Sequence, residues 1–159
     1  MLVPWKQMLR RAQERGYAIG AFNTYNLEIT QAIFRAAEAK RAPVIVQTGS
    51  GALKYAGRDP LAASVLAHAR AIPSPASVHL DHSTSINEIA ECLRLGYTGV
   101  MIDGSALRFG ENVELTRQVV EIAREYGASV EAERGAIVGA EDLAEVGATS
   151  AAMTDPAQA

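Results

Sequence analysis

Short apolar runs alternate with amphipathic stretches along almost the whole 159-residue chain, and this alternation restricts the fold more than any other feature. The apolar runs are interpreted as strands, and they lie at 17–22, 43–47, 77–81, 98–102 and 128–132. Apolar residues three and four positions apart predict helices at 5–14, 27–40, about 59–70, 85–95 and about 111–125. Strands that alternate with helices in this way predict an α/β fold with a parallel sheet and helical crossovers.

Two local signals refine these boundaries. The small residues 48–51 (Thr-Gly-Ser-Gly) predict a loop after the second strand. Ser85 and Glu88 have the spacing of a capping box, in which each residue's side chain accepts a hydrogen bond from the other's backbone N–H. The third strand therefore runs almost directly into a helix.

Composition excludes several classes of protein. The chain is 48% hydrophobic and 21% charged, with a formal net charge of -3, which is typical of a soluble globular protein and argues against a nucleic-acid partner. No apolar run approaches the roughly 20 residues that span a membrane. The first residues lack the pattern of a secretory signal, and the single cysteine, Cys92, is interpreted as a packing residue. We therefore expect a cytoplasmic protein.

Polar or ionisable side chains follow every predicted strand at its C-terminal end. They are Asn23, Gln47, Ser50, Asp81, His82, Asp103, Ser105, Glu131 and Glu133. The C-terminal ends of parallel strands lie at one edge of a sheet, where α/β enzymes hold their reactive groups. Carboxylates gathered there would repel one another unless a cation were bound or some were protonated. Oxygen and imidazole ligands suit zinc or another divalent metal.

A plainer explanation stays open for each of these acids. Negative side chains are favoured at helix N-termini, where they face unpaired backbone N–H groups. The pair Asp81 and His82, taken alone, is also typical of a strand end that only caps the following turn. The metal-site interpretation therefore depends on the whole set of strand-end residues.

Several segments closely resemble the class II, zinc-dependent ketose-bisphosphate aldolases, which act on fructose or tagatose bisphosphate. They are 78–82 (Val-His-Leu-Asp-His), 100–105 (Val-Met-Ile-Asp-Gly-Ser) with Phe109, Glu111 and Asn112, 129–133 (Ser-Val-Glu-Ala-Glu) and 139–142 (Gly-Ala-Glu-Asp). The segments 20–23, 43–47 and 154–159 also fit, so the resemblance covers essentially the whole chain.

The resemblance implies a (β/α)8 barrel, of which residues 1–159 form the N-terminal part with about five of the eight units. It also implies reversible cleavage of a ketose 1,6-bisphosphate to dihydroxyacetone phosphate and glyceraldehyde 3-phosphate, a reaction of carbohydrate metabolism. A bound Zn²⁺ would stabilise the enediolate that this cleavage generates. The implied partner is a phosphorylated sugar, and we expect a homo-oligomer.

The family's functional residues map onto this sequence as follows. His82 matches a ligand of the catalytic zinc, and Asp103 and Glu133 match carboxylates near an alternative metal position. Asp81 matches the acid that moves a proton on the substrate C4 hydroxyl. Glu141 matches a glutamate of a mobile loop, so 134–159 is predicted to be a mobile active-site loop and tail.

Asn23 and Ser50 match two further family positions, which line the substrate pocket. The sequence also departs from the family pattern. Arg134 stands where leucine is usual, Ala140 replaces a loop glycine or acid, and Ser83 replaces the common glycine or histidine after Asp-His. These departures weaken any choice between fructose and tagatose.

Length leaves two other hypotheses open. The family's remaining zinc histidines and main phosphate loops lie beyond residue 159, and a barrel of this kind needs about 250 residues. The chain could therefore be a non-catalytic half-barrel that pairs with a second copy or another chain. It could also be an unrelated metal-dependent barrel enzyme that shares only the strand-end acids.

Overall fold

The computed structural model describes residues 1–135, 140–141, 144–145 and 154–157. Its helices are α1 (Trp5–Arg15), α2 (Leu27–Lys40), α3 (Ser50–Ala56), α4 (Arg58–Ala71), α5 (Ile86–Leu95) and α6 (Phe109–Glu125). Its strands are β1 (Gly20–Asn23), β2 (Val44–Gly49), β3 (Ala76–Ser83), β4 (Gly99–Ile102), β5 (Ser129–Ala132), β6 (Ala140–Glu141) and β7 (Ala144–Glu145). None of the described helices is long and apolar enough to cross a membrane.

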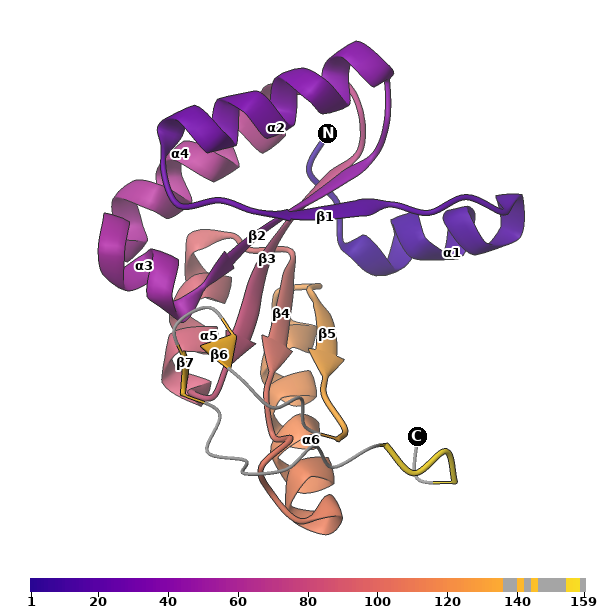
Figure 1. Ribbon diagram of the computed structural model, residues 1–159, viewed down its shortest axis with the longest axis vertical. Coiled ribbons are helices and arrows are strands. Elements are labelled where there is room, and N and C mark those ends of the chain that lie inside the picture. Colours follow the sequence, from indigo (N-terminus) through magenta and orange to yellow (C-terminus); the bar gives the residue numbers. More distant parts are fainter. Residues whose placement is uncertain (136–139, 142–143, 146–153, 158–159) are drawn as a thin grey trace.

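The first five strands form one sheet in the order β1-β2-β3-β4-β5 (Figure 1). Every neighbouring pair is parallel, and a helix connects each strand to the next. This is the arrangement of successive units in a (β/α)8 barrel. The predicted fold class, an incomplete barrel of about five units, is therefore confirmed.

The two faces of the sheet differ in chemistry because side chains alternate along a strand. One face packs on the helices, and its residues form a continuous apolar core that includes Val46, Val78, Leu80, Val100 and Ile102. The register places a second row on the opposite face, made of Gln47, His79, Asp81, Met101 and Glu131. In a barrel this second face is the interior, so the polar groups of the sheet point inward.

Helix α1 stands apart from the other helices and closes the N-terminal end of the inner face (Figure 1). The indole Nε1 of Trp5 donates a hydrogen bond of 3.2 Å to Nδ1 of the buried His79, and the two rings meet edge to face. The backbone N–H of Lys6 donates to Ser129 Oγ at 3.1 Å. A Cβ at Gly99 would collide with both the indole and the imidazole, so glycine is required beneath this contact.

One expectation was wrong. Residues 48–51 do not form a loop, because β2 continues to Gly49 and α3 begins at Ser50. Thr48 is buried and its hydroxyl lies 2.9 Å from the Tyr97 hydroxyl, so these small residues serve close packing. His68 is half-buried and stacks on Phe34 at a centroid distance of 5.9 Å. Cys92 is fully buried, as predicted.

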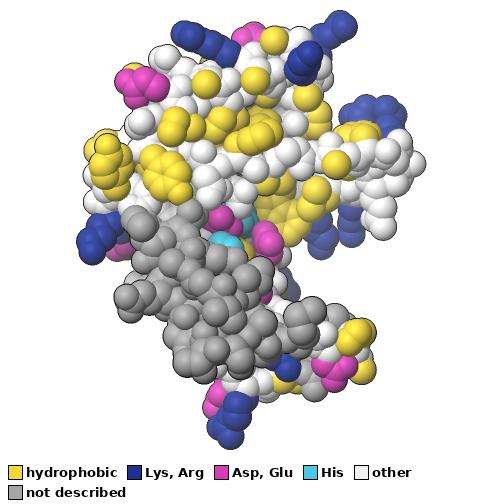
Figure 2. Space-filling view, viewed as in Figure 1, with side chains coloured by type: hydrophobic (Ala, Val, Ile, Leu, Met, Phe, Trp, Pro, Cys, Tyr) yellow, Lys and Arg dark blue, Asp and Glu magenta, His cyan; other side chains and the backbone are white. Residues whose placement is uncertain are grey.

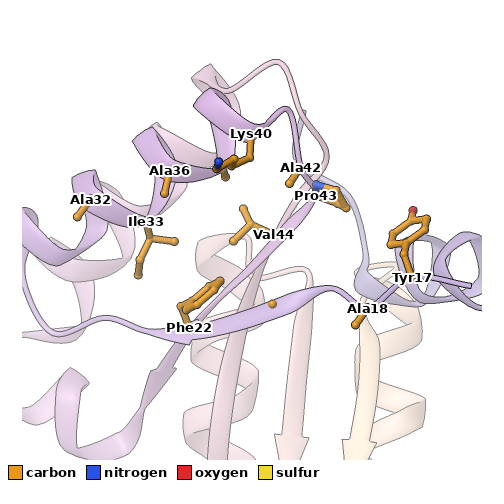
Figure 3. A pocket seen from close by; sticks show the side chains of 12 residues that line it. Tyr17, Ala18, Phe22, Ala32, Ile33, Ala36, Lys40, Ala42, Pro43 and Val44 are labelled. Atoms are coloured by element: carbon orange, nitrogen blue, oxygen red, sulfur yellow. The ribbon is translucent and has the colours of Figure 1, made fainter.

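The flank of β1 is apolar and uncovered by the residues that the structure describes. A groove of about 520 Å³ runs between β1 and α2, and Phe22 and Ile33 face each other across it (Figure 3). Phe22 is 52% exposed, which is unusual for a phenylalanine in a strand. In a closed barrel the first strand has a neighbour on both sides, and this flank is where a closing element would pack.

The contact between α1 and the inner face can be tested by Gly99→Ala. The added methyl group would push Trp5 away from His79, and we expect the free energy of unfolding to fall by about 1–3 kcal/mol. Trp5 is the only tryptophan, so its fluorescence should report the displacement directly. In the matched control Gly110→Ala nothing lies near the new methyl group. Because alanine favours helix more than glycine does, the free energy of unfolding of Gly110→Ala should rise by about 0.5–1 kcal/mol. Equal stability of the two variants would contradict the proposed clash.

Candidate metal centre

Three side chains meet where β3, β4 and β5 end. Nδ1 of His82 lies 3.3 Å from Oδ2 of Asp103 and 3.5 Å from Oε2 of Glu133. One ligand atom from each residue lies within 4.8 Å of the others, and all three residues are half-buried. Figure 2 shows histidine and acidic side chains together in the middle of one face, below the broad apolar area. The sequence-predicted metal residues are thus brought together.

His82 reaches this cluster through an unusual backbone conformation. Its φ is 47°, in the left-handed region that residues other than glycine rarely adopt. The β3–β4 register also shifts between Leu80 and Ser83. In a regular strand the neighbours Asp81 and His82 would point to opposite faces. The left-handed residue breaks this alternation, so that the imidazole joins the inner-face acids.

Asp103 is held in place by the turn that follows it. Its Oδ1 accepts a hydrogen bond of 2.9 Å from the backbone N–H of Ser105. Its own N–H donates to Ser83 O at 2.8 Å and ties the end of β4 to β3. Burial acts to raise the pKa of Asp103, but the hydrogen bonds with Ser105 and His82 outweigh burial and lower the pKa below its usual range. The group is therefore an anion at neutral pH.

Asn112 of α6 fixes the backbone at Glu133. Its Nδ2 donates a hydrogen bond of 2.7 Å to the Glu133 carbonyl oxygen, and its Oδ1 accepts from Thr116 Oγ at 3.3 Å. The amide also packs against Gly104, where a Cβ would collide with it. Asn112 belonged to a family-like segment but received no role from the sequence, because nothing in its spacing links helix α6 to the end of β5.

Asp81, the predicted proton-transfer residue, lies deeper on the same inner face. Its side chain is buried, 8% exposed. Burial raises the pKa of Glu131, and the Asp81 carboxylate raises it further. Two neighbouring acids resist joint ionisation, so one of them keeps its proton to a higher pH than an isolated carboxyl group would. Such a pair has the chemistry to accept and release a proton beside the cluster of His82, Asp103 and Glu133.

The remaining predicted residues have different placements. Ser50 opens α3 and its hydroxyl donates to Glu88 at 2.6 Å. Asn23 is exposed at the end of β1, where its backbone pairs with Gln47. The backbone of Glu141 belongs to β6, but its side chain lies outside the described residues. Ser50 and Asn23 lie at the predicted end of their strands, and the roles of all three remain predictions.

The chemistry of the cluster fits a divalent cation. Two carboxylates converge on a single imidazole nitrogen, an arrangement that a cation between them would stabilise. One imidazole and two carboxylates are a donor set found at zinc and other divalent-metal sites. The assignment of His82, Asp103 and Glu133 as ligands remains a prediction.

Comparison with known proteins gives one consistent family. The profile "Fructose-bisphosphate aldolase class-II" matches residues 3–159. A fructose-bisphosphate aldolase of Thermus caldophilus is 45% identical over 159 residues, which is 100% of this chain and 52% of that protein. One from Streptococcus pneumoniae is 47% identical over 144 residues, 89% of this chain and 49% of that protein.

Solved structures agree with the sequence relatives. A putative fructose-1,6-biphosphate aldolase from Coccidioides immitis superposes with a TM-score of 0.88 at 33% identity, covering 96% of this chain and 54% of that one. The YdjI aldolase from Escherichia coli gives a TM-score of 0.82 at 31% identity, covering 85% and 51%. The chain spans about half the length of the relatives it matches.

The environment of His79 predicts a dependence of stability on pH. Burial, together with the nearby His82, lowers the pKa of His79 to about 4. Between the usual value near 6.5 and about 4, the unfolded chain binds a proton that the folded chain does not. The stabilisation is therefore complete above about pH 6.5, and about 3 kcal/mol is lost as the pH falls to 4.

This loss is measured by urea unfolding at pH 7 and pH 4.5, compared with His79→Gln. The variant should lose less stability than the original chain over this range. His68→Gln serves as the control because His68 is half-buried and stacked elsewhere, on Phe34. NMR titration of the imidazoles gives an independent reading. Protonation of His79 near pH 6.5 would contradict the prediction.

The metal-ligand assignment can be tested with Co²⁺, whose visible spectrum reports its ligands. Replacement of a ligand commonly weakens binding strongly, and we expect His82→Ala to raise the Co²⁺ dissociation constant at least tenfold. Asp103→Asn should also weaken binding and change the spectrum. His68→Ala is the matched histidine control and should bind as the original chain does. Equal binding by all variants would exclude this cluster.

Proposed function

This chain belongs to the class-II fructose-bisphosphate aldolase family, and we propose that it provides the catalytic rim of a zinc-dependent aldolase. The proposed reaction is the reversible cleavage of a ketose 1,6-bisphosphate, fructose or tagatose, to dihydroxyacetone phosphate and glyceraldehyde 3-phosphate. The observation that carries the proposal is the convergence of His82, Asp103 and Glu133 at the C-terminal ends of three adjacent strands. That rim is where barrels of this type hold their reactive groups.

His82, Asp103 and Glu133 are proposed to hold the cation. When bound there, a divalent metal supplies a Lewis acid that stabilises negative charge on the substrate carbonyl oxygen. A Schiff-base lysine is the other common way to stabilise that charge. Lys6, Lys40 and Lys54 are the only lysines, and each lies on a helix rather than at a strand end.

Proton transfer is assigned to two acids. Cleavage requires removal of the proton from the substrate C4 hydroxyl, and Asp81 is proposed as the base. The neighbouring Glu131, whose pKa is raised by burial and by Asp81, limits the negative charge beside it. Glu141 is proposed to exchange a proton at the dihydroxyacetone phosphate carbon. Asn23 and Ser50 are proposed to line the substrate pocket.

The proposed reaction implies a class of ligand, a metabolic role and a cellular compartment. The small-molecule partner would be a phosphorylated sugar, and the role would belong to carbohydrate metabolism in the cytoplasm. Assembly into a homo-oligomer stays a prediction.

One observation favours the second candidate, a non-catalytic half-barrel that pairs with another chain. The groove between β1 and α2 leaves Phe22 exposed along the open edge of the sheet. Sedimentation equilibrium of the 159-residue chain separates the candidates. A stable dimer that binds no metal would favour the non-catalytic role.

The proposed activity is best tested in a chimaera. Residues 1–159 are joined to the second half of the Thermus caldophilus relative, of which this chain matches 52%. We expect metal-dependent cleavage of fructose 1,6-bisphosphate that is lost with a chelator and restored by Zn²⁺. Tagatose 1,6-bisphosphate is assayed in parallel. A folded, metal-loaded chimaera that cleaves neither substrate would refute the proposal.

Asp81→Asn in this chimaera tests the base. Loss of a general base should lower kcat by about 10²–10⁴-fold while metal content stays unchanged. Asp59→Asn is the matched control, because Asp59 lies on α4 with 72% of its side chain exposed and pairs only with Arg58 among the described ion pairs. Full activity of Asp81→Asn would remove Asp81 from the mechanism.

A further inference from the structure

Helix α6 holds the chain at the end of β5 in two places. The Asn112 amide donates a hydrogen bond of 2.7 Å to the Glu133 carbonyl oxygen. One helical turn earlier, the guanidinium carbon of Arg134 lies 5.4 Å from the centroid of the Phe109 ring, which is within the range of a cation–π contact. Residues three positions apart lie on the same face of a helix, so one face of α6 contacts two consecutive residues of the chain.

The side chains of Glu133 and Arg134 are directed toward different elements. Oε2 of Glu133 lies 3.5 Å from Nδ1 of His82 on β3, whereas Arg134 contacts Phe109, the first residue of α6. Glu133 and Arg134 are both half-buried. A groove of about 420 Å³ beside α6 is lined by Phe109, Glu133 and Arg134 together. The Arg134 side chain therefore has room to move from the ring to the carboxylate.

These two positions of the guanidinium have different consequences for the metal centre. A guanidinium pairs with a carboxylate through two parallel hydrogen bonds, which engage both oxygens. On Glu133 it would occupy the atoms that a metal ion needs, and it would place a positive charge beside that ion. Over the Phe109 ring it is attracted by the negative face of the π-system, and Glu133 stays directed to His82.

We propose that Phe109 is a positioning residue of the metal centre, because its ring holds the Arg134 guanidinium on α6 and keeps this cation from pairing with Glu133. The inference rests on the proposed function for the role of Glu133 as a metal ligand. Leucine, the usual residue at position 134 in the family, has no charge and needs no such partner. Asn112 fixes the Glu133 backbone separately, so loss of the ring moves the Arg134 side chain without releasing the strand end.

The first test is NMR spectroscopy of the metal-free 159-residue chain. Protons over the face of an aromatic ring are shifted upfield, so the Arg134 side-chain signals should be displaced in the unsubstituted chain and lose this displacement in Phe109→Leu. The Glu133 carboxyl carbon signal should also shift in Phe109→Leu, because the guanidinium then reaches it. In an Arg134→Met background the same substitution should leave that signal in place. A Glu133 signal that does not respond, or that responds equally in both backgrounds, overturns the proposal.

The second measurement is the Co²⁺ dissociation constant of the same four chains. Phe109→Leu should raise it by about threefold or more, because Arg134 then competes for Glu133. Arg134→Met should not raise it, and the double variant should match Arg134→Met within about twofold. This rescue separates competition by Arg134 from lost packing, since a packing defect would persist without the guanidinium. An equal rise in both backgrounds overturns the proposal.

Three control variants complete the design. Phe109→Tyr keeps an aromatic face and should behave as the unsubstituted chain does in both measurements. Tyr126→Leu removes an exposed ring at the other end of α6. Arg117→Met removes a guanidinium from the same helix, where it pairs with Glu114. The last two variants should change neither the Glu133 signal nor the dissociation constant.

The two measurements also separate this inference from the proposed function. A chain that binds no Co²⁺ would contradict the metal-ligand assignment, and the metal-free NMR comparison would still decide the role of Phe109. An inactive chimaera with the expected NMR pattern and rescue would refute the proposed function alone. An active chimaera with a Glu133 signal that ignores Phe109→Leu would refute the role of Phe109 alone.

Discussion

The left-handed backbone at His82 is the constraint on which the arrangement of the site depends. Side chains of adjacent strand residues point to opposite faces, and one of those faces is occupied by the helices. Without the break at His82, its imidazole would lie in the apolar core formed by Leu80 and Ile102. The conformation has a steric cost for a residue with a Cβ, so the surrounding contacts must maintain it. The hydrogen bond from Asp103 N–H to the neighbouring Ser83 is one such contact.

The inner face of the sheet shows how the buried His79 is accommodated among polar neighbours. Trp5 supplies a hydrogen-bond donor to one nitrogen of His79, which leaves the other nitrogen to carry the proton in the neutral ring. That nitrogen lies 3.4 Å from a carboxylate oxygen of Glu131, but the lowered pKa of His79 makes this a contact with a neutral ring rather than an ion pair. The buried His79 is therefore neutral, while the ionised Asp103 lies where β4 ends.

Sequence periodicity predicted the fold well because each strand and helix buries one face. Burial of one face makes apolar residues recur at regular intervals, and the sequence shows these intervals. It also predicted which residues follow the strands, and the structure gathers His82, Asp103 and Glu133. It failed where partners are distant in sequence or where packing overrides residue preference. Glu88 was assigned to a local cap, but two hydroxyls on other elements hold its carboxylate. No periodicity shows that a glutamate will turn toward Ser50, 38 positions away.

The docking of α1 has a consequence for how the chain is made. Its contacts join residues that are 74 and 123 positions apart, Trp5 with His79 and Lys6 with Ser129. While the ribosome extends the chain, this helix has no complete surface to rest on until the fifth strand has left the exit tunnel. Contacts between such distant segments slow folding, because long loops must close first. Helix α1 is therefore synthesised before the strands that it packs against, and its docking completes late in folding.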